Sequence, residues 1–225
     1  MIAVVRNLLV LLFLAAALSI FWVAAYRVVD PPATSLMLRD RLAGLSVKRE
    51  TRPLADISPH LPRAVIAAED SNFCSHRGFD LEAIEKALEA NREGGRLRGG
   101  STISQQVAKN AFLWPGRTWL RKGLEAWFTF WLETLLPKPR IMELYLNIVE
   151  WDRGVYGAEA AAQGYFGKPA ARLSRQEAAR LAAILPSPVD RSAARPGRWT
   201  RRYAGTIEAR MRVVARDGLD ACLRA

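Results

Sequence analysis

The chain opens with an unbroken apolar stretch and continues with apolar residues at helical spacing. Residues 8–26 carry no charge and are bracketed by Arg6 and Arg27. From residue 58 onward, apolar positions recur three or four residues apart, which is the spacing of amphipathic helices. No strand-like run exceeds a few residues, and no segment repeats. We therefore expect an all-α domain over residues 50–225, preceded by an N-terminus (1–7), a transmembrane helix (8–26) and a juxtamembrane connection (27–49).

Helix-start and helix-end signals divide the domain into successive helices. Ser58-Pro59 begins a helix that ends at Glu69, and Asp80 caps a second one that ends near Asn91. Capping boxes begin two more helices, at residues 102–105 and 174–177. Prolines at positions 137 and 139 break the chain. We expect the other helices within residues 112–136, 140–149, 158–163 and 199–215.

The apolar stretch 8–26 suits a membrane anchor. About 20 apolar residues span a bilayer core, whereas the apolar region of a cleaved signal peptide has about 7–15. Trp22 and Tyr26 fit the aromatic belt at the outer end. We favour an uncleaved single-pass helix over a signal peptide cut near residue 24. The positive-inside rule does not favour an outside domain, because several arginines also follow the helix.

Residues 112–136 form a second unusual stretch, with more than half of the seven tryptophans. A broad apolar helix face consists of Leu120, Leu124, Trp127, Phe128, Trp131 and Leu135. Arg121, Glu125 and Thr129 form a polar line at i, i+4 and i+8. The apolar face fits a core helix, at least in part. The tryptophans beside basic residues also fit partial immersion in a membrane interface.

The composition adds a strong positive charge. Lys and Arg number 33 against 22 Asp and Glu, which gives a formal net charge of +11. Such a surface suits nucleic acid, anionic lipid or a phosphorylated substrate. The two cysteines, Cys74 and Cys222, could pair in an oxidising compartment, but nothing in the sequence brings them together. Together with the two histidines they lack the spacing of a zinc finger.

Residues 69–80 (EDSNFCSHRGFD) combine groups that suit acid–base chemistry. Glu69 and Asp70 follow a run of small apolar residues, and apolar surroundings raise the pKa of a carboxyl group. A carboxylate that leaves a helix into a polar loop is therefore a candidate acid or base. Ordinary solvated charges at a helix end are the plain alternative, and these residues alone do not decide between the two.

Residues 94–102 have the ingredients of an anion site. Glycines permit close approach, N–H groups are free at a helix start, and arginines lie beside it. The segment is not a Walker loop, because Ser101 replaces the required lysine. Downstream, Thr102, Gln105 or Gln106, and Lys109 form a polar stripe that suits a ligand groove.

Together these segments resemble the motifs of the peptidoglycan glycosyltransferase family, the transglycosylase domain of class A penicillin-binding proteins and of monofunctional enzymes. The matching segments are residues 69–80 (EDSNFCSHRGFD), 98–110 (RGGSTISQQVAKN), 121–125 (RKGLE), 141–168 (IMELYLNIVEWDRGVYGAEAAAQGYFGK) and 173–188 (LSRQEAARLAAILPSP). The chain ends at Ala225 without room for a transpeptidase domain, so it most resembles the monofunctional biosynthetic type. Residues 151–154 (WDRG) depart from the WGPG often found in the fourth motif, which puts local loop contacts in doubt.

The resemblance implies a lysozyme-like helical fold and polymerisation of lipid II into peptidoglycan glycan strands. The reaction inverts the anomeric carbon and releases undecaprenyl pyrophosphate. Glu69 would be the general base, and Glu125 the second catalytic carboxylate. The implied substrate-binding residues are Asp70, Phe73, His76, Ser101, Thr102, Gln105, Gln106, Lys109, Arg117, Arg121 and Lys122. For His76, bracing of the loop fits better than direct catalysis.

A pyrophosphate leaving group needs positive charge or a divalent metal more than it needs a proton. A divalent cation (Mg²⁺ or Mn²⁺) is therefore the one cofactor to consider. The implied partners are lipid II, the growing glycan chain, membrane lipid and other cell-wall synthesis proteins, and not nucleic acid. The implied location is the inner membrane of a bacterium, with the catalytic domain on the periplasmic side.

Two other functions stay open. A lysozyme-like hydrolase or lytic transglycosylase would share the fold and a catalytic glutamate, but would not need the basic helix start or the arginines around Glu125. A membrane-anchored basic binding protein would need positive charge, but not the carboxylates at these spacings.

Overall fold

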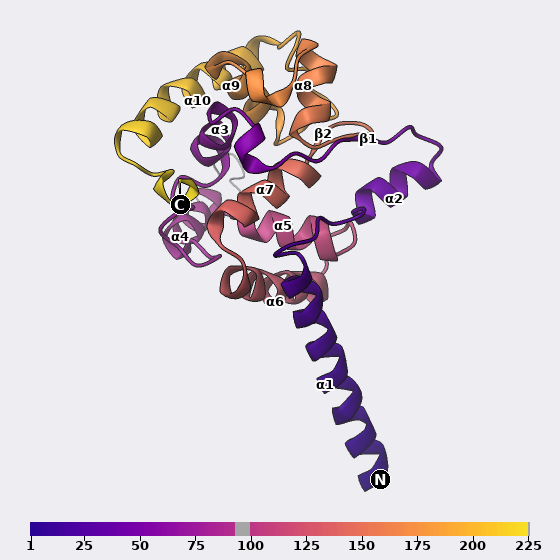
Figure 1. Ribbon diagram of the computed structural model, residues 1–225. Helices are drawn as coiled ribbons and strands as arrows, with labels where there is room; N and C mark the ends of the chain where they lie inside the picture. Colours follow the sequence, from indigo (N-terminus) through magenta and orange to yellow (C-terminus); the bar gives the residue numbers. More distant parts are fainter. Residues whose placement is uncertain (93–99, 225) are drawn as a thin grey trace.

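A computed structural model describes residues 1–92 and 100–224 of the chain. Helices dominate it (Figure 1), which confirms the expected all-α class. The elements are α1 (Ile2–Ala25), α2 (Ser35–Leu42), β1 (Lys48–Arg49), the 3₁₀ turn η1 (Leu54–Asp56), α3 (His60–Glu69), α4 (Leu81–Arg92), α5 (Ile103–Phe112), α6 (Trp119–Leu135), α7 (Lys138–Ile148), β2 (Glu150–Asp152), β3 (Val155–Tyr156), α8 (Ala158–Phe166), η2 (Ala170–Arg172), α9 (Arg175–Ile184), α10 (Arg198–Arg216) and η3 (Ala221–Leu223).

The local start signals act as expected. Thr102 and Ser174 each form a capping box, with Gln105 and Glu177 respectively. The side chain of Asp80 accepts the Ala83 N–H at 2.9 Å and so caps α4. Two helices differ from expectation. Helix α8 continues through Gly164 to Phe166, and α2 was not expected at all. The basic stretch 94–99 lies outside the described residues.

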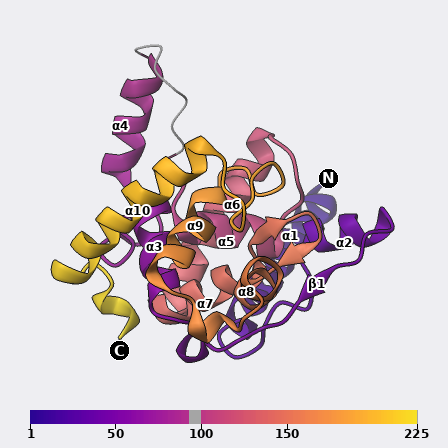
Figure 2. The same cartoon turned by 90° about the horizontal axis from the view of Figure 1, so that it is seen from above.

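The helices pack in three levels around α5 and α7 (Figures 1 and 2). Helices α3, α9 and α10 pack on one another above this centre, and α6 packs against α5 below it. Fully buried apolar side chains join the levels, among them Leu61 of α3, Ile103 of α5, Leu132 of α6 and Tyr145 of α7. The end of α3 and the start of α5 therefore meet inside the domain.

A small sheet ties the juxtamembrane connection to the domain. Strand β1 pairs in parallel with β3, in the register Lys48 to Val155, and β3 pairs antiparallel with β2. Gly154 turns the chain between β2 and β3 with φ of +73°, and a Cβ there would lie 2.7 Å from the Ser46 carbonyl oxygen. Residues 151–154, which depart from the WGPG of the family motif, thus belong to the hairpin with which β1 pairs.

Helix α1 is the one helix among the described residues that is long and apolar enough to cross a membrane, with a mean hydropathy of 2.7. It leaves the body as a free rod at its N-terminal end (Figure 1). Its other end is fixed by an aromatic cluster, in which the rings of Trp22 and Phe112 meet edge-on at 5.2 Å and those of Phe112 and Phe128 stack at 4.5 Å. Arg140 adds hydrogen bonds to the carbonyl oxygens of Tyr26 and Val29.

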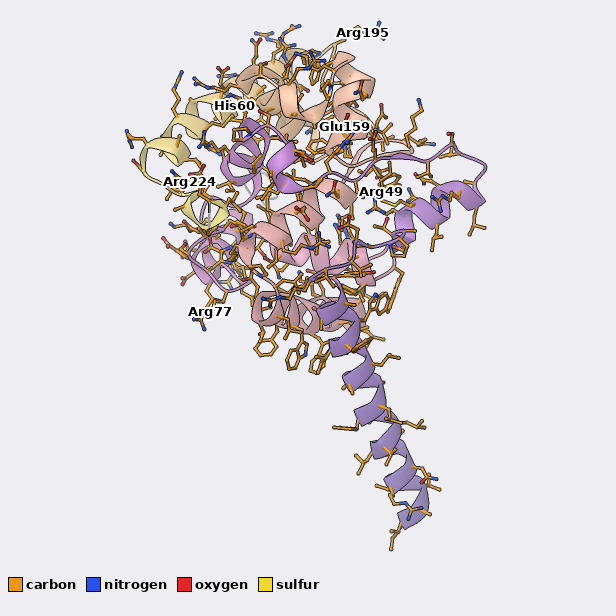
Figure 3. The ribbon with its side chains drawn as sticks, viewed as in Figure 1. Arg49, His60, Arg77, Glu159, Arg195 and Arg224 are labelled. Atoms are coloured by element: carbon orange, nitrogen blue, oxygen red, sulfur yellow. A yellow bond between two sulfur atoms is a disulfide. The ribbon has the colours of Figure 1, made fainter. Side chains whose placement is uncertain are left out.

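Helix α6 turns its polar line inward and much of its apolar face outward. Arg121, Glu125 and Thr129 are buried, whereas Trp119 is 93% exposed and Phe130 is 54% exposed. Figure 3 shows rings that hang from α6 on the side where α1 leaves the body. The core interpretation holds for a part of this helix, because Phe128 and Leu132 lie in the core. Leu120 and Trp127 are exposed, and immersion of this part in a membrane interface stays a prediction.

Candidate active site

Glu69 is the last residue of α3 and reaches into a polar cavity. The preceding residues Val65, Ile66 and Ala67 are buried, and the helix ends because Asp70 adopts φ of −160°. The Glu69 Oε2 atom accepts a hydrogen bond of 2.9 Å from Nε2 of Gln106 on α5. The oxygen of that amide accepts from the Tyr145 hydroxyl at 3.4 Å. Tyr145 thereby turns the N–H₂ of Gln106 toward the carboxylate.

The surroundings change the pKa of the Glu69 carboxyl group. Removal of water around the carboxyl raises the pKa of Glu69 above its ordinary value, and the nearby charge of Asp70 adds to the rise. The Gln106 hydrogen bond and the positive charge of Lys109 oppose it. A carboxylate with a raised pKa is a stronger base than a solvated one.

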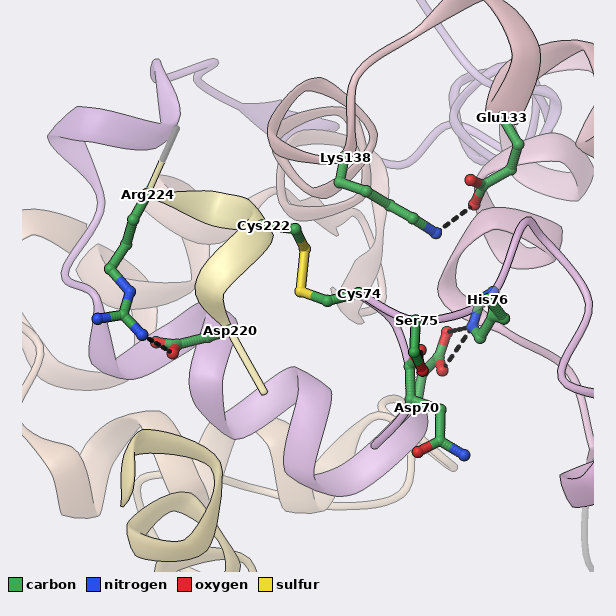
Figure 4. The surroundings of a disulfide bond; sticks show 10 residues. Asp70, Cys74, Ser75, His76, Glu133, Lys138, Asp220, Cys222 and Arg224 are labelled. Atoms are coloured by element: carbon green, nitrogen blue, oxygen red, sulfur yellow. Dashed lines mark hydrogen bonds and ion pairs between the residues drawn. A yellow bond between two sulfur atoms is a disulfide. The ribbon is translucent and has the colours of Figure 1, made fainter. Parts of the chain in front are cut away.

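Asp70 and His76 brace the loop that follows Glu69. Asp70 is buried, and its carboxylate accepts from the N–H of Ile103 (2.9 Å) and meets Nε2 of His76 (2.9 Å), as Figure 4 shows for the second contact. The N–H of Gly78 donates to Nδ1 of His76 at 3.1 Å, so in neutral His76 the proton sits on Nε2 and is donated to Asp70. The carboxylate of Asp70 therefore joins the loop to the first N–H groups of α5.

Thr102 and Gln105 are both used inside the protein. The N–H of Thr102 donates to the Gln105 side-chain oxygen at 3.0 Å, and the Thr102 hydroxyl donates to the Gly78 carbonyl at 2.6 Å. Gly78 has φ of +88°, and a Cβ on it would lie 2.8 Å from the side chain of Thr129. Both residues make capping contacts, Thr102 also lines the Glu69 cavity, and substrate binding by either residue stays a prediction.

A second cluster lies on the inward face of α6. Glu125 is 3% exposed, and its two carboxylate oxygens pair with Nη1 of Arg121 (2.8 Å) and with Nζ of Lys122. The Nε atom of Arg121 is buried and has no acceptor among the described residues. Because a buried donor without a partner costs free energy, this N–H is available to a ligand.

The two clusters line adjoining cavities. Glu69 and Asp70 line a cavity of about 200 Å³. Lys109, Arg117, Arg121, Lys122 and Glu125 line a larger cavity of about 490 Å³. Ser101, at the start of α5, lines both. The structure thus places a basic carboxylate beside a pocket of several cations.

Lys109 interacts electrostatically with both clusters. Partial removal of water lowers the pKa of the Lys109 ammonium, and the positive charge of Arg121 lowers it too. The negative charges of Glu125 and Glu69 oppose this effect. Both carboxylates lie within electrostatic range of one ammonium group, so a ligand that fills the larger cavity is held within range of Glu69.

Apart from Gln105, the expected site residues separate into three groups. Glu69, Asp70, Ser101, Lys109, Arg117, Arg121, Lys122 and Glu125 line the cavities, together with Thr102. Gln106 and His76 contact the carboxylates of Glu69 and Asp70. Phe73 is fully buried under the ammonium of Lys138, and a substrate contact for it stays a prediction.

Sequence reasoning did not find several residues of the site. Arg210 of α10 is exposed and lines the Glu69 cavity, more than 100 positions away in the chain. Ser35 and Leu36, at the start of α2, line the cation cavity. Tyr145 lies within the apolar period of α7 and gave no sign of its contact with Gln106. No local signal marks these residues, because the tertiary fold brings them to the site.

The donor groups do not fit a divalent cation held by the protein. Both oxygens of Glu125 are occupied by cationic side chains, and the other named polar residues of the larger cavity include several cations. The described residues contain no group of three His, Cys, Asp or Glu side chains that could hold a metal ion. The cavity suits a polyanion directly, since lysine and arginine bind phosphate oxygens.

Comparison with known sequences assigns this arrangement to one family. The Transglycosylase family matches residues 39–216. A biosynthetic peptidoglycan transglycosylase of Caulobacter vibrioides is 52% identical over 219 residues, which cover 97% of this chain and 96% of that protein. A protein of the same description from Rhodospirillum centenum is 54% identical over 209 residues, which cover 92% and 90%. One from Xanthomonas campestris pv. campestris is 50% identical over 210 residues, which cover 90% and 85%.

Proposed function

The chain belongs to the transglycosylase family, with relatives described as biosynthetic peptidoglycan transglycosylases, and we propose that it joins lipid II units into glycan strands by base catalysis at Glu69. It is a glycosyltransferase. The single observation that supports the mechanism is the pairing of the two cavities. One holds a carboxylate of raised pKa, and the next holds several cations.

The proposed reaction is a displacement at the anomeric carbon. The 4-hydroxyl oxygen of the lipid II acceptor attacks C1 of the donor sugar, and the C1–O bond to the pyrophosphate breaks. Glu69 takes the hydroxyl proton. Undecaprenyl pyrophosphate leaves with the electron pair of the broken bond, and the configuration at C1 inverts. The base and the leaving group act on opposite faces of the sugar, which agrees with their separate cavities.

Cations stabilise the leaving group in this account. The charge that develops on the pyrophosphate oxygens is met by Lys109, Arg117, Arg121 and Lys122, with the free Nε–H of Arg121 as a preorganised donor. Glu125 holds Arg121 and Lys122 in place and neutralises part of their mutual repulsion. We therefore assign Glu125 the role of positioning the cations. A Mg²⁺ or Mn²⁺ ion would reach this site bound to the pyrophosphate oxygens.

The structure favours transfer over hydrolysis of glycan. A glycosidase uses a pair of carboxyl groups, one as acid and one as base or nucleophile. In the Glu69 cavity, Asp70 is bonded to His76 and Ile103, and Asp80 is bonded to Asn72 and Ala83. Of the carboxylates that line this cavity, only Glu69 has no structural partner beyond one amide. A binding protein without catalysis would not need a carboxylate of raised pKa.

We further propose that the domain lies on the outer side of the bacterial inner membrane, anchored by α1. The exposed rings of α6 and the fixed end of α1 support a shallow seat in the lipid interface, where a lipid-linked substrate is found. The Cys74–Cys222 disulfide supports the outer side, because disulfides persist in oxidising compartments. The arginines that follow α1 do not favour this orientation, and we give the disulfide more weight.

The experiment is to incubate the full-length protein with labelled lipid II in detergent. We expect glycan polymer and undecaprenyl pyrophosphate. Release of soluble fragments from purified cell-wall glycan, without polymer from lipid II, would favour the hydrolase. Binding of lipid II without any product would favour the binding protein.

A further inference from the structure

A disulfide joins the loop after Glu69 to the C-terminal end of the described chain. Cys74 and Cys222 are bonded, with a Cα–Cα distance of 5.5 Å and a sequence separation of 148 (Figure 4). Cys74 lies between Phe73 and the braced His76, and Cys222 lies in η3. The chain has two cysteines, so this is the one disulfide that it can form within itself.

The C-terminal end of this bridge is itself held firmly. We call residues 220–224 the C-terminal clasp. Asp220 is 4% exposed and accepts from Nε of Arg63 on α3 at 2.5 Å. Arg224 donates to the other oxygen of Asp220 at 3.0 Å. The clasp is thus attached to α3, the helix that carries Glu69, and through the disulfide to the loop that follows it.

The other end of the bridge is next to the groups that brace the catalytic loop. Phe73 is fully buried, and Nζ of Lys138 lies 4.5 Å from the centre of its ring. Lys138 pairs with Glu133 of α6 at 2.7 Å. His76 contacts Asp70, which follows Glu69 directly. Displacement of Cys74 would therefore be transmitted to the carboxylates through two or three residues.

We propose that the Cys74–Cys222 disulfide is a positioning device that holds the Glu69 loop in its catalytic geometry, so that the oxidised protein is the fully active form. The inference rests on the proposed role of Glu69. Formation of the bond takes two protons and two electrons from the two thiols, and a disulfide-bearing oxidant of the outer compartment accepts the electrons. A dithiol reductant reverses the step, and its own sulfurs become the disulfide.

Loss of the bond has a consequence at Glu69 that simple destabilisation lacks. A looser loop admits water to the carboxylate, which is faced by Asp70 on its own loop, by Gln106 and Lys109 on α5, by Tyr145 on α7, and by Tyr203 and Arg210 on α10. Because burial is the main cause of the raised pKa of Glu69, hydration moves its titration to lower pH. The acid limb of the pH–rate profile therefore moves to lower pH as well.

The test compares three forms of the full-length protein on lipid II: oxidised wild type, wild type in dithiothreitol, and the double variant Cys74→Ser, Cys222→Ser. We expect kcat to fall on the order of 10–100-fold in the second and third, as misplacement of a catalytic group does, with KM little changed. The acid limb of the pH profile should move to lower pH in both. The double variant is the matched control for the reductant and should not respond to it.

Several outcomes would overturn the inference. One is a reduced, folded protein with the kcat and acid limb of the oxidised form. Another is free thiols on both cysteines in protein isolated from the outer compartment, as alkylation and mass spectrometry would detect. Circular dichroism at the assay temperature is the check that the reduced form is folded. If oxidised wild type makes no polymer at all, the proposed function fails instead, which keeps the two failures apart.

Discussion

The side-chain amide of Gln106 donates a hydrogen bond of 2.9 Å to the carboxylate of Glu69, the residue that we propose as the base. The bond stabilises the ionised carboxylate and opposes the rise in pKa that burial causes. Gln106 is on α5 and Glu69 ends α3, so the contact also joins these two helices at the site.

Replacement of Gln106 by Leu is expected to move the acid limb of kcat/KM to higher pH. The ionised form of Glu69 loses its donor, so its pKa rises further and less of the base is ionised at a given pH. The rate should fall on the acid side of the profile and recover at alkaline pH. Polymerisation rates at a series of pH values give the limb.

The matched control for this change is Gln163→Leu, which removes an amide on α8 that bonds only to Glu159. Its pH profile should overlay that of wild type. An unmoved limb in Gln106→Leu would show that Glu69 does not govern the acid side of the profile.

Replacement of Glu69 by Gln is expected to stabilise the folded protein at pH values above the ordinary pKa of a glutamate. The raised pKa means that ionisation of Glu69 is harder in the folded state than in the unfolded chain. The stability that belongs to the protonated group is present at low pH and is lost as pH rises through the raised pKa. The uncharged amide avoids that loss, so its melting temperature should exceed that of wild type by a margin that grows from acid to neutral pH. Equal melting curves at pH 7 would contradict the burial of a charged Glu69.

Lys109→Met is expected to lower kcat by about 10²–10³-fold, the effect of removing one preorganised electrostatic group from a transition state. Its ammonium lies within electrostatic range of both Glu69 and Glu125. Lys86→Met is the control, because Lys86 is an exposed lysine of α4 that pairs with Glu82. Steady-state rates on lipid II decide the matter. A kcat near that of wild type in Lys109→Met would remove Lys109 from the leaving-group site.

The exposed rings of α6 provide a test of membrane seating. The double change Trp119→Ser, Phe130→Ser removes two outward side chains that are largely outside the core. Activity on lipid II in liposomes should fall more than activity on a short-chain analogue in solution, because only the first requires insertion at the interface. The control is Val213→Ser on α10, an exposed apolar residue in the opposite level of the fold. Equal losses on both substrates would argue against the seat.

The sequence predicted most of the helices through local rules. Capping boxes at Thr102 and Ser174 and the cap at Asp80 are confirmed, because each depends on contacts between residues three positions apart in the sequence. The pairing of Arg121 with Glu125 followed from one turn of helix and is also confirmed. Such contacts depend on spacing alone, and the sequence contains that spacing.

The remaining features depend on how distant elements meet. Nothing near Cys74 indicates Cys222, and nothing near Glu69 indicates Arg210, because the tertiary fold brings η3 to the first and α10 to the second. The orientation of α6 was equally open. A helix with one polar and one aromatic face can bury either, and here the carboxylate–arginine pair is inside. The lipid interface that we propose for this face would make the outward rings favourable.

The most direct test of the central claim is the rate of lipid II polymerisation by Glu69→Gln in the full-length, oxidised protein. Gln keeps the hydrogen bond to Gln106 through its side-chain oxygen but cannot accept the proton of the attacking hydroxyl. We predict a loss of at least about 10²-fold in kcat, the lower end of a general-base contribution, with lipid II binding and the fold retained. Polymer formation at the wild-type rate would contradict the assignment of Glu69 as the base.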